Sequence, residues 1–158
     1  MSIELYYNAF SNGGFHFSNL QEFTQKRKAL PVACEYEIEF IRGRDYQQTL
    51  VQRCGSVTLI FSAVETVEAW ENQEMTDIFH DRLLQGYDLD VALIQTKQVV
   101  FYSDFDDYLE AVVFKGMGEG SIWVQYFDRE AYERDTLLNR TLIKTDSGIY
   151  YTNPSIQH

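Results

Sequence analysis

The stretch "SAVETVEAWENQEMTDIFHD", residues 62–81, combines helically spaced apolar side chains with a run of acids. Val64, Val67 and Trp70 recur every third residue, which predicts one buried helix face. Ser62, with a Glu three residues later, has the spacing of a capping box and predicts where the helix begins. The acidic run, as we call residues 62–81, is therefore expected to be helical.

A second helix is predicted within and beyond the acidic run. Asn72 is placed to cap it, and Gly86 is placed to end it. Its expected inward side chains are Met75, Ile78, Phe79, Leu83 and Leu84.

The acidic run contains no Lys or Arg. Mixed signs would stabilise a helix, because each Glu–Lys pair four residues apart adds about 0.2–0.5 kcal/mol. Residues 60–110 hold twelve acids and two bases, whereas the rest of the chain holds twelve acids and eleven bases. Nearly all of the net negative charge thus lies in the middle of the chain. Acids that serve only solubility would be spread more evenly.

The residues before the acidic run are rich in strand signals. Residues 3–10 and 15–17 flank an Asn-Gly-Gly turn and predict a hairpin. Asn19 predicts the cap of a short helix that ends by Pro31. Residues 35–42 alternate apolar and acidic side chains, as in a half-buried strand, and residues 56–61 are predicted to form another strand.

The residues after the acidic run alternate between helix and strand signals. Residues 89–101 suit either structure, and Ser103 with Asp106 predicts the start of a helix. A glycine-rich loop at 116–121 precedes a short apolar element. Asp128 predicts a helix cap, and the chain closes with a hairpin that turns at residues 146–148.

The expected fold class is α+β, with three small subdomains. These are a β-rich part at 1–61, an acidic helical part at 62–115 and a mixed part at 116–158. The chain of 158 residues is 45% hydrophobic, which is typical of a folded protein rather than an acidic tail.

The formal charge of −11 argues against nucleic acid or an anionic membrane as a partner and favours a basic protein. The start of the chain lacks the features of a signal peptide, and no apolar run is long enough to span a bilayer, so a cytoplasmic protein is expected. Cys34 and Cys54 are expected to be reduced thiols, with a single disulfide as the alternative.

Catalytic motifs are weak throughout. The glycines at 116–120 have the wrong spacing for a phosphate loop, and neither cysteine has a His or cationic neighbour in sequence. Glu74, Asp77, His80 and Asp81 could share a helix face as metal ligands, but no matching Glu-x-x-His occurs elsewhere. We therefore expect a protein that is not an enzyme and has no metal or other cofactor.

Acids at every third residue of the run rise about 4.5 Å per step and wind slowly around a helix. B-DNA carries one charge per about 1.7 Å of axis when both strands are counted. A folded core that holds such carboxylates in place would present a phosphate-like pattern. The solvated face of a helical bundle is the alternative explanation.

Several segments resemble the ArdA-type antirestriction proteins, which are small acidic DNA mimics. "YYNAFSNGGFHFSNL" is similar to that family's opening strands, and "EYEIEFIRG" to its acidic-aromatic strand. "GYDLDVALIQTKQVVFYSDFDDYLEAVVF" is similar to its central stretch, and "QYFDREAYERDTLLNRTLIKTDSGIYY" to its closing helix and hairpin. One departure is Arg42-Gly43-Arg44, where the family is acidic.

The resemblance implies an elongated homodimer of three subdomains, whose carboxylates occupy the basic DNA groove of a type I restriction–modification enzyme in a bacterial host. The acids that it assigns to this role are Asp88, Asp90, Asp104, Asp106, Asp107, Glu110, Asp128, Glu130 and Asp135. Charge alone adds Glu65, Glu68, Glu71, Glu74, Asp77 and Asp81. Alternative functions are inhibition of a CRISPR effector, an acidic immunity or interaction module, and a small metal-dependent hydrolase.

Overall fold

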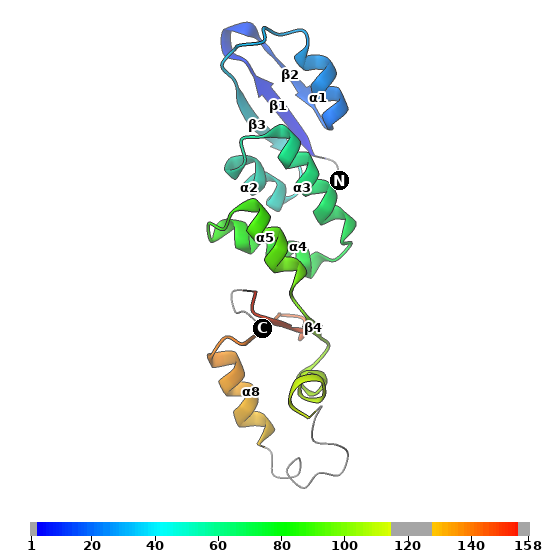
Figure 1. Ribbon diagram of the computed structural model, residues 1–158, viewed down its shortest axis with the longest axis vertical. Coiled ribbons are helices and arrows are strands. Elements are labelled where there is room, and N and C mark those ends of the chain that lie inside the picture. Colours follow the sequence, from blue (N-terminus) through cyan, green and yellow to red (C-terminus); the bar gives the residue numbers. More distant parts are fainter. Residues whose placement is uncertain (1–2, 115–127, 155–158) are drawn as a thin grey trace. The chain divides into compact units, whose positions relative to one another are not determined.

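The computed structural model describes residues 3–114 and 128–154 and divides into two compact units, Met1–Ile94 and Gln95–His158. Helices and two small antiparallel sheets make up these described parts (Figure 1). The predicted α+β class is confirmed. We describe each unit by itself.

The first unit begins with a three-stranded antiparallel sheet. Its strands are β1 (Glu4–Asn8), β2 (Gly14–Phe17) and β3 (Glu37–Arg42), in the order β2-β1-β3. A 3-10 turn, η1 (Phe10–Asn12), connects β1 to β2, and Gly13 follows it at a φ of 91°, a value that favours glycine. The predicted hairpin and the alternating strand are both confirmed.

Helix α1 (Leu20–Arg27) lies beside this sheet (Figure 1). The Asn19 side chain accepts a hydrogen bond of 2.8 Å from the Glu22 backbone N–H, so the predicted cap is confirmed. Phe23 of this helix packs in a cluster of rings with Tyr7, Phe15 and Phe17 of the sheet. Aromatic burial therefore holds α1 on the sheet.

The rest of the first unit is helical, with α2 (Asp45–Arg53), α3 (Val57–Ala69) and α4 (Gln73–Leu84). The Phe61 ring of α3 meets the Phe17 ring edge-on, with centroids 5.9 Å apart, and this contact joins the helices to the sheet. The Phe79 ring of α4 makes similar contacts with Tyr46 and Trp70. One hydrophobic core thus runs from the sheet to α4.

The strand predicted at residues 56–61 is wrong, because these residues form the start of α3. The Ser56 side chain accepts a hydrogen bond from the Leu59 N–H at 3.3 Å and caps the helix. Ser62, the predicted cap, lies inside the helix instead. The β-forming composition of this segment is overridden because its apolar residues meet the core at helical spacing, with Val57, Ile60, Ala63 and Val67 buried.

Helix α4 follows the prediction closely. Asn72 accepts a hydrogen bond of 3.1 Å from the Met75 N–H, and Gly86 follows the helix with a φ of 96°. Ile78, Phe79 and Leu83 are buried, but Leu84, also expected to face inward, is 57% exposed.

Helix α5 (Leu89–Lys97) spans the division between the two units. It settles the ambiguity of residues 89–101, since a short strand, β4 (Phe101–Tyr102), follows it. The remaining elements of the second unit are α6 (Phe105–Tyr108), the π-helical turn η2 (Leu109–Val113), α8 (Arg129–Leu138), β5 (Leu142–Lys144) and β6 (Tyr150–Thr152).

The sheet of the second unit has the strand order β4-β6-β5. Phe105, Tyr108, Leu109, Leu142 and Tyr150 form its buried core. The predicted closing hairpin is therefore confirmed, with Gly148 at a φ of 90° in its turn.

Two helix starts in the second unit test the predicted caps. Asp128 caps α8 through a hydrogen bond of 3.1 Å from the Ala131 N–H, as predicted. Asp104 rather than Ser103 caps α6, by accepting from the Asp107 N–H at 2.8 Å. The predicted loop at 116–121 and the apolar element after it lie outside the described residues.

The predicted boundary after residue 61 falls inside α3, and the one after residue 115 lies beyond the described range. The three-subdomain division therefore stays a prediction. In residues 3–114 and 128–154, no helix is both long and apolar enough to cross a membrane.

Replacing Ser56 with Ala tests where α3 begins. We expect Ser56→Ala to cost about 1 kcal/mol of folding free energy, because the cap is lost. Thermal unfolding would then shift down by about 2–4 °C for a chain of this size. Ser62→Ala is the matched control and should not lower the midpoint, since the Ser62 side chain caps nothing. The reverse pattern would place the helix start at residue 62.

Candidate functional site

The fifteen acids predicted to mimic phosphates lie on the surface. All are exposed except Glu74, which is half-buried. In the first unit they lie on α3 and α4, in the turn between them, and at the start of α5. This set comprises Glu65, Glu68, Glu71, Glu74, Asp77, Asp81, Asp88 and Asp90.

Glu68 differs from the other acids because several side chains of α2 and the residue before it hold it in place. One Arg44 nitrogen, Nη1, donates to both Glu68 oxygens at 3.0 Å, and the buried Tyr46 hydroxyl donates to Oε1 at 2.6 Å. Burial and then this hydrogen bond raise the pKa of Tyr46 above its ordinary value. Glu68 thus serves the fold through an ion pair.

Arg44 extends this network to α4. Its Nη2 donates to the Gln73 side-chain oxygen, and the Gln73 amide donates to Asp77 at 2.7 Å. One turn later, the Gln85 amide donates to Asp81 at 2.8 Å. Neutral amides therefore orient Asp77 and Asp81, and Asp81 also pairs with Arg82, whose Nη2 lies 3.5 Å from Oδ2.

A polar cavity of about 330 Å³ lies beside this network. Its lining residues are Arg44, Asp45, Tyr46, Gln73, Thr76, Asp77 and His80. The His80 ring nitrogen Nε2 is 2.8 Å from the Thr49 hydroxyl, so Thr49 occupies one of its two nitrogens. Within the described ranges, no three or more His, Cys, Asp or Glu side chains gather closely enough to hold a metal.

The second unit carries the other seven acids, and several of them have local structural roles. Asp104 and Asp128 cap α6 and α8, as described above. Asp107 accepts from the Ser103 N–H and hydroxyl at 3.3 Å, and Asp106 pairs with Arg129 at 2.5 Å. The remaining members of the set, Glu110, Glu130 and Asp135, are exposed.

Sequence reasoning passed over the acid Glu133, which is half-buried on α8. It accepts a hydrogen bond from the Tyr150 hydroxyl, and Arg129 lies 3.8 Å from it. Burial and then this bond raise the pKa of Tyr150 to about 12. Glu133 therefore belongs to the packing of the second unit.

Few of the fifteen acids are neutralised. Among the described residues, salt bridges reach three of them, in the pairs Glu68–Arg44, Asp81–Arg82 and Asp106–Arg129. The other twelve carboxylates make no salt bridge to a described Lys, Arg or His. The surface charge inferred from composition is thus largely unscreened by the described part of the protein itself.

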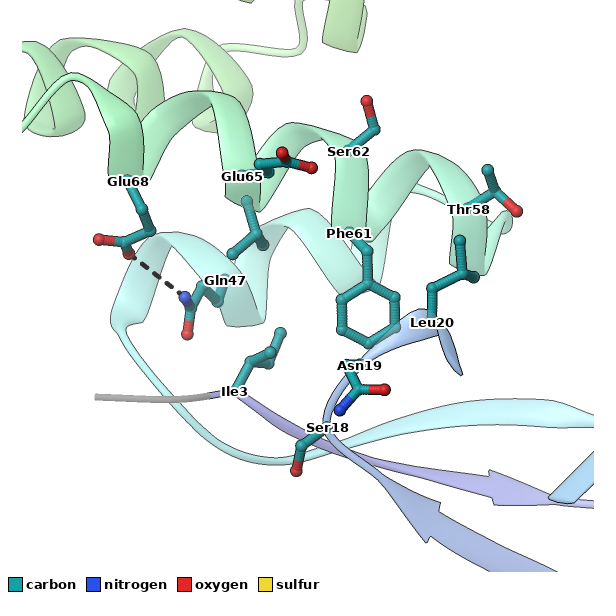
Figure 2. Close-up of a pocket in the computed structure, with 11 residues that line it drawn as sticks. Ile3, Ser18, Asn19, Leu20, Gln47, Thr58, Phe61, Ser62, Glu65 and Glu68 are labelled. Carbon is teal, nitrogen blue, oxygen red and sulfur yellow. Dashed lines mark hydrogen bonds between the residues drawn. The ribbon is translucent and has the colours of Figure 1, made fainter. Parts of the chain in front are cut away.

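We call the surface of α3, α4 and the turn between them the acidic face; its acids are Glu65, Glu68, Glu71, Glu74, Asp77 and Asp81. An apolar groove lies next to this face (Figure 2). It has a volume of about 520 Å³ and lies between α3, the start of α1 and the residue before β1. Its lining includes Ile3, Leu20 and Phe61, with Glu65 and Glu68 at one end. Sequence reasoning missed this groove, because no sequence pattern links residues so far apart.

Both cysteines are free and half-buried, in agreement with the expected thiols. Comparison with known proteins adds no assignment: no protein-family model matches this chain, and no curated protein matches it significantly. The resemblance to the ArdA-type proteins therefore stays a prediction.

Truncating Glu68 tests its structural role. We expect Glu68→Ala to lower the free energy of unfolding by about 1–3 kcal/mol, because Arg44 and buried Tyr46 lose their acceptor. Glu65→Ala, also on α3 and without a salt bridge to a described residue, is the control and should change stability by less than about 0.5 kcal/mol. Urea unfolding of both variants measures the difference. Equal losses would contradict the network.

Proposed function

We propose that this protein is a non-catalytic DNA mimic that inhibits a host DNA-binding defence enzyme, a type I restriction–modification enzyme in the first place. The observation that carries the proposal is the unscreened surface charge. Fourteen of the fifteen acids are exposed, and twelve make no salt bridge to a described residue. The sequence resemblance to the ArdA-type proteins supplies the identity of the target.

The physical basis is competition for a basic groove. A DNA-binding groove is lined by Lys and Arg that neutralise phosphates, and an acidic protein surface can satisfy the same cations. Opposite charge also accelerates the encounter and makes it sensitive to salt. Catalysis and a cofactor have no part in this mechanism, and the basic target replaces nucleic acid and membrane as the partner.

Helix α4 provides spacing suited to this role. Asp77 and Asp81 are four residues apart, which corresponds to about 6 Å along a helix axis. Two base-pair steps of B-DNA rise about 6.8 Å on one strand. The Gln73 and Gln85 amides hold these carboxylates, so less side-chain entropy is lost on binding.

The other parts of the proposal follow the resemblance. They are a homodimer in the bacterial cytoplasm and a role in counter-defence. If no type I enzyme is inhibited, the same charge argument applies to a CRISPR effector or to a basic toxin with this chain as its immunity partner. A metal-dependent hydrolase built on Glu74, Asp77 and His80 would instead require stoichiometric metal and activity that His80→Ala abolishes.

Charge reversal on the acidic face tests the proposal. We expect the double variant Glu71→Lys, Asp77→Lys to raise the concentration needed for half-inhibition about tenfold or more, the effect of about 1.4 kcal/mol of lost attraction. The readout is ATP-dependent cleavage of unmodified DNA by a purified type I restriction enzyme.

The matched control is Glu35→Lys, Glu37→Lys, which changes the net charge equally at exposed residues just before β3 and at its start. It should inhibit as well as the natural sequence, and circular dichroism should show that both variants are folded. Equal weakening by the two variants would leave only net charge as the cause. Full inhibition by the Glu71→Lys, Asp77→Lys variant would remove the assignment of this face.

A further inference from the structure

The apolar groove of the first unit has a floor of apolar side chains that DNA mimicry does not use. Figure 2 shows the Phe61 ring pointing from α3 toward the segment of Asn19 and Leu20. Ile3 lines the same groove, and Leu20 is 38% exposed. The groove has a volume of about 520 Å³, which falls in the range of sites that hold small apolar ligands or anchoring side chains.

The charge at the groove selects its occupant. Among the described residues that line it are two carboxylates and no Lys, Arg or His. Arg44 neutralises Glu68, but Glu65 is exposed and makes no salt bridge to a described residue. An anionic ligand is therefore repelled, whereas an apolar group that carries a nearby cation is favoured.

We propose that this groove holds an apolar side chain from a basic helical segment of the inhibited protein, with a Lys or Arg of that segment against Glu65. This inference rests on the proposed function for the source of the segment. It adds to that function, because the phosphates that the carboxylates imitate provide no apolar groove for a partner's side chain to fill. Recognition then has an apolar part that salt does not weaken.

The face of α3 that borders the groove supports a helical occupant. Its lining residues follow one side of α3 over about three turns: Thr58, Phe61, Ser62, Val64, Glu65 and Glu68. A helix docked along this side would place apolar anchors every three or four residues. A Leu over Phe61 therefore lies within a turn of a cation that reaches Glu65.

The test uses a pair of short synthetic helical peptides, one with Leu and Lys at intervals of three and four residues, and one with Glu in place of each Lys. Titration of the full-length protein, followed by amide chemical shifts, reports where each peptide binds. We expect shift changes at the groove with the Lys peptide and about tenfold weaker binding of the Glu peptide.

Two variants obstruct the groove and leave the apolar side chains of its floor unchanged. Ser62→Trp places a large ring at an exposed lining position, and Thr58→Arg places a cation at another. Each should weaken binding of the Lys peptide about tenfold. Leu59→Trp is the matched control, because Leu59 is 53% exposed on the same helix but does not line the groove.

Shift changes elsewhere on the protein, equal affinity for the two peptides, or unchanged binding by both groove variants would overturn the inference. The inhibition assay separates its failure from that of the proposed function. Inhibition without peptide binding would contradict the docking groove and leave the DNA-mimic function standing. Peptide binding without inhibition of any DNA-binding enzyme would contradict the DNA-mimic function and leave the docking groove standing.

Discussion

Arg44 makes the contacts on which the acidic face of the first unit depends. It pairs with Glu68 of α3, donates to Gln73 of α4 and lies 5.3 Å from the centre of the Tyr46 ring of α2. Three helices meet through one guanidinium, whose several donors suit such a junction. In the sequence, this residue stands out as a base where the resembled family is acidic. In the structure, Glu68 neutralises it, and the other acids of the acidic face make no salt bridge to it.

The crowding of like charges has a cost that helix propensity alone does not offset, because no Lys alternates with the acids of the run. Tertiary packing offsets this repulsion. The Phe79 ring meets Tyr46 and Trp70 edge-on, and Phe61 meets Phe17, so aromatic contacts join both acidic helices to the rest of the first unit. The carboxylates are then displayed on helices that aromatic packing holds in place together with the Arg44–Glu68 ion pair.

Two surfaces of different chemistry meet along α3. One is the carboxylate face that continues onto α4, and the other is the groove over Phe61. A partner that reads only charge would release the protein at high salt, whereas a partner that also fills the groove would be held by apolar burial. The pairing of these surfaces is the structural basis for both proposals, and it suggests how an acidic mimic discriminates among several basic proteins.

The sequence by itself determined the local structure wherever the signal was short-range. The Asn-Gly-Gly hairpin and the caps at Asn19, Asn72 and Asp128 form as predicted, because each depends on residues within a few positions. The exposure of the acids followed from charge, since an unpaired carboxylate is rarely buried.

Tertiary structure decided the rest. Residues 56–61 became helical through packing against the core, and Glu68 became an ion-pair partner through Arg44, twenty-four residues away. The groove arose only when Ile3, Leu20 and Phe61 came together. These outcomes depend on contacts between distant residues, which no local spacing in the sequence encodes.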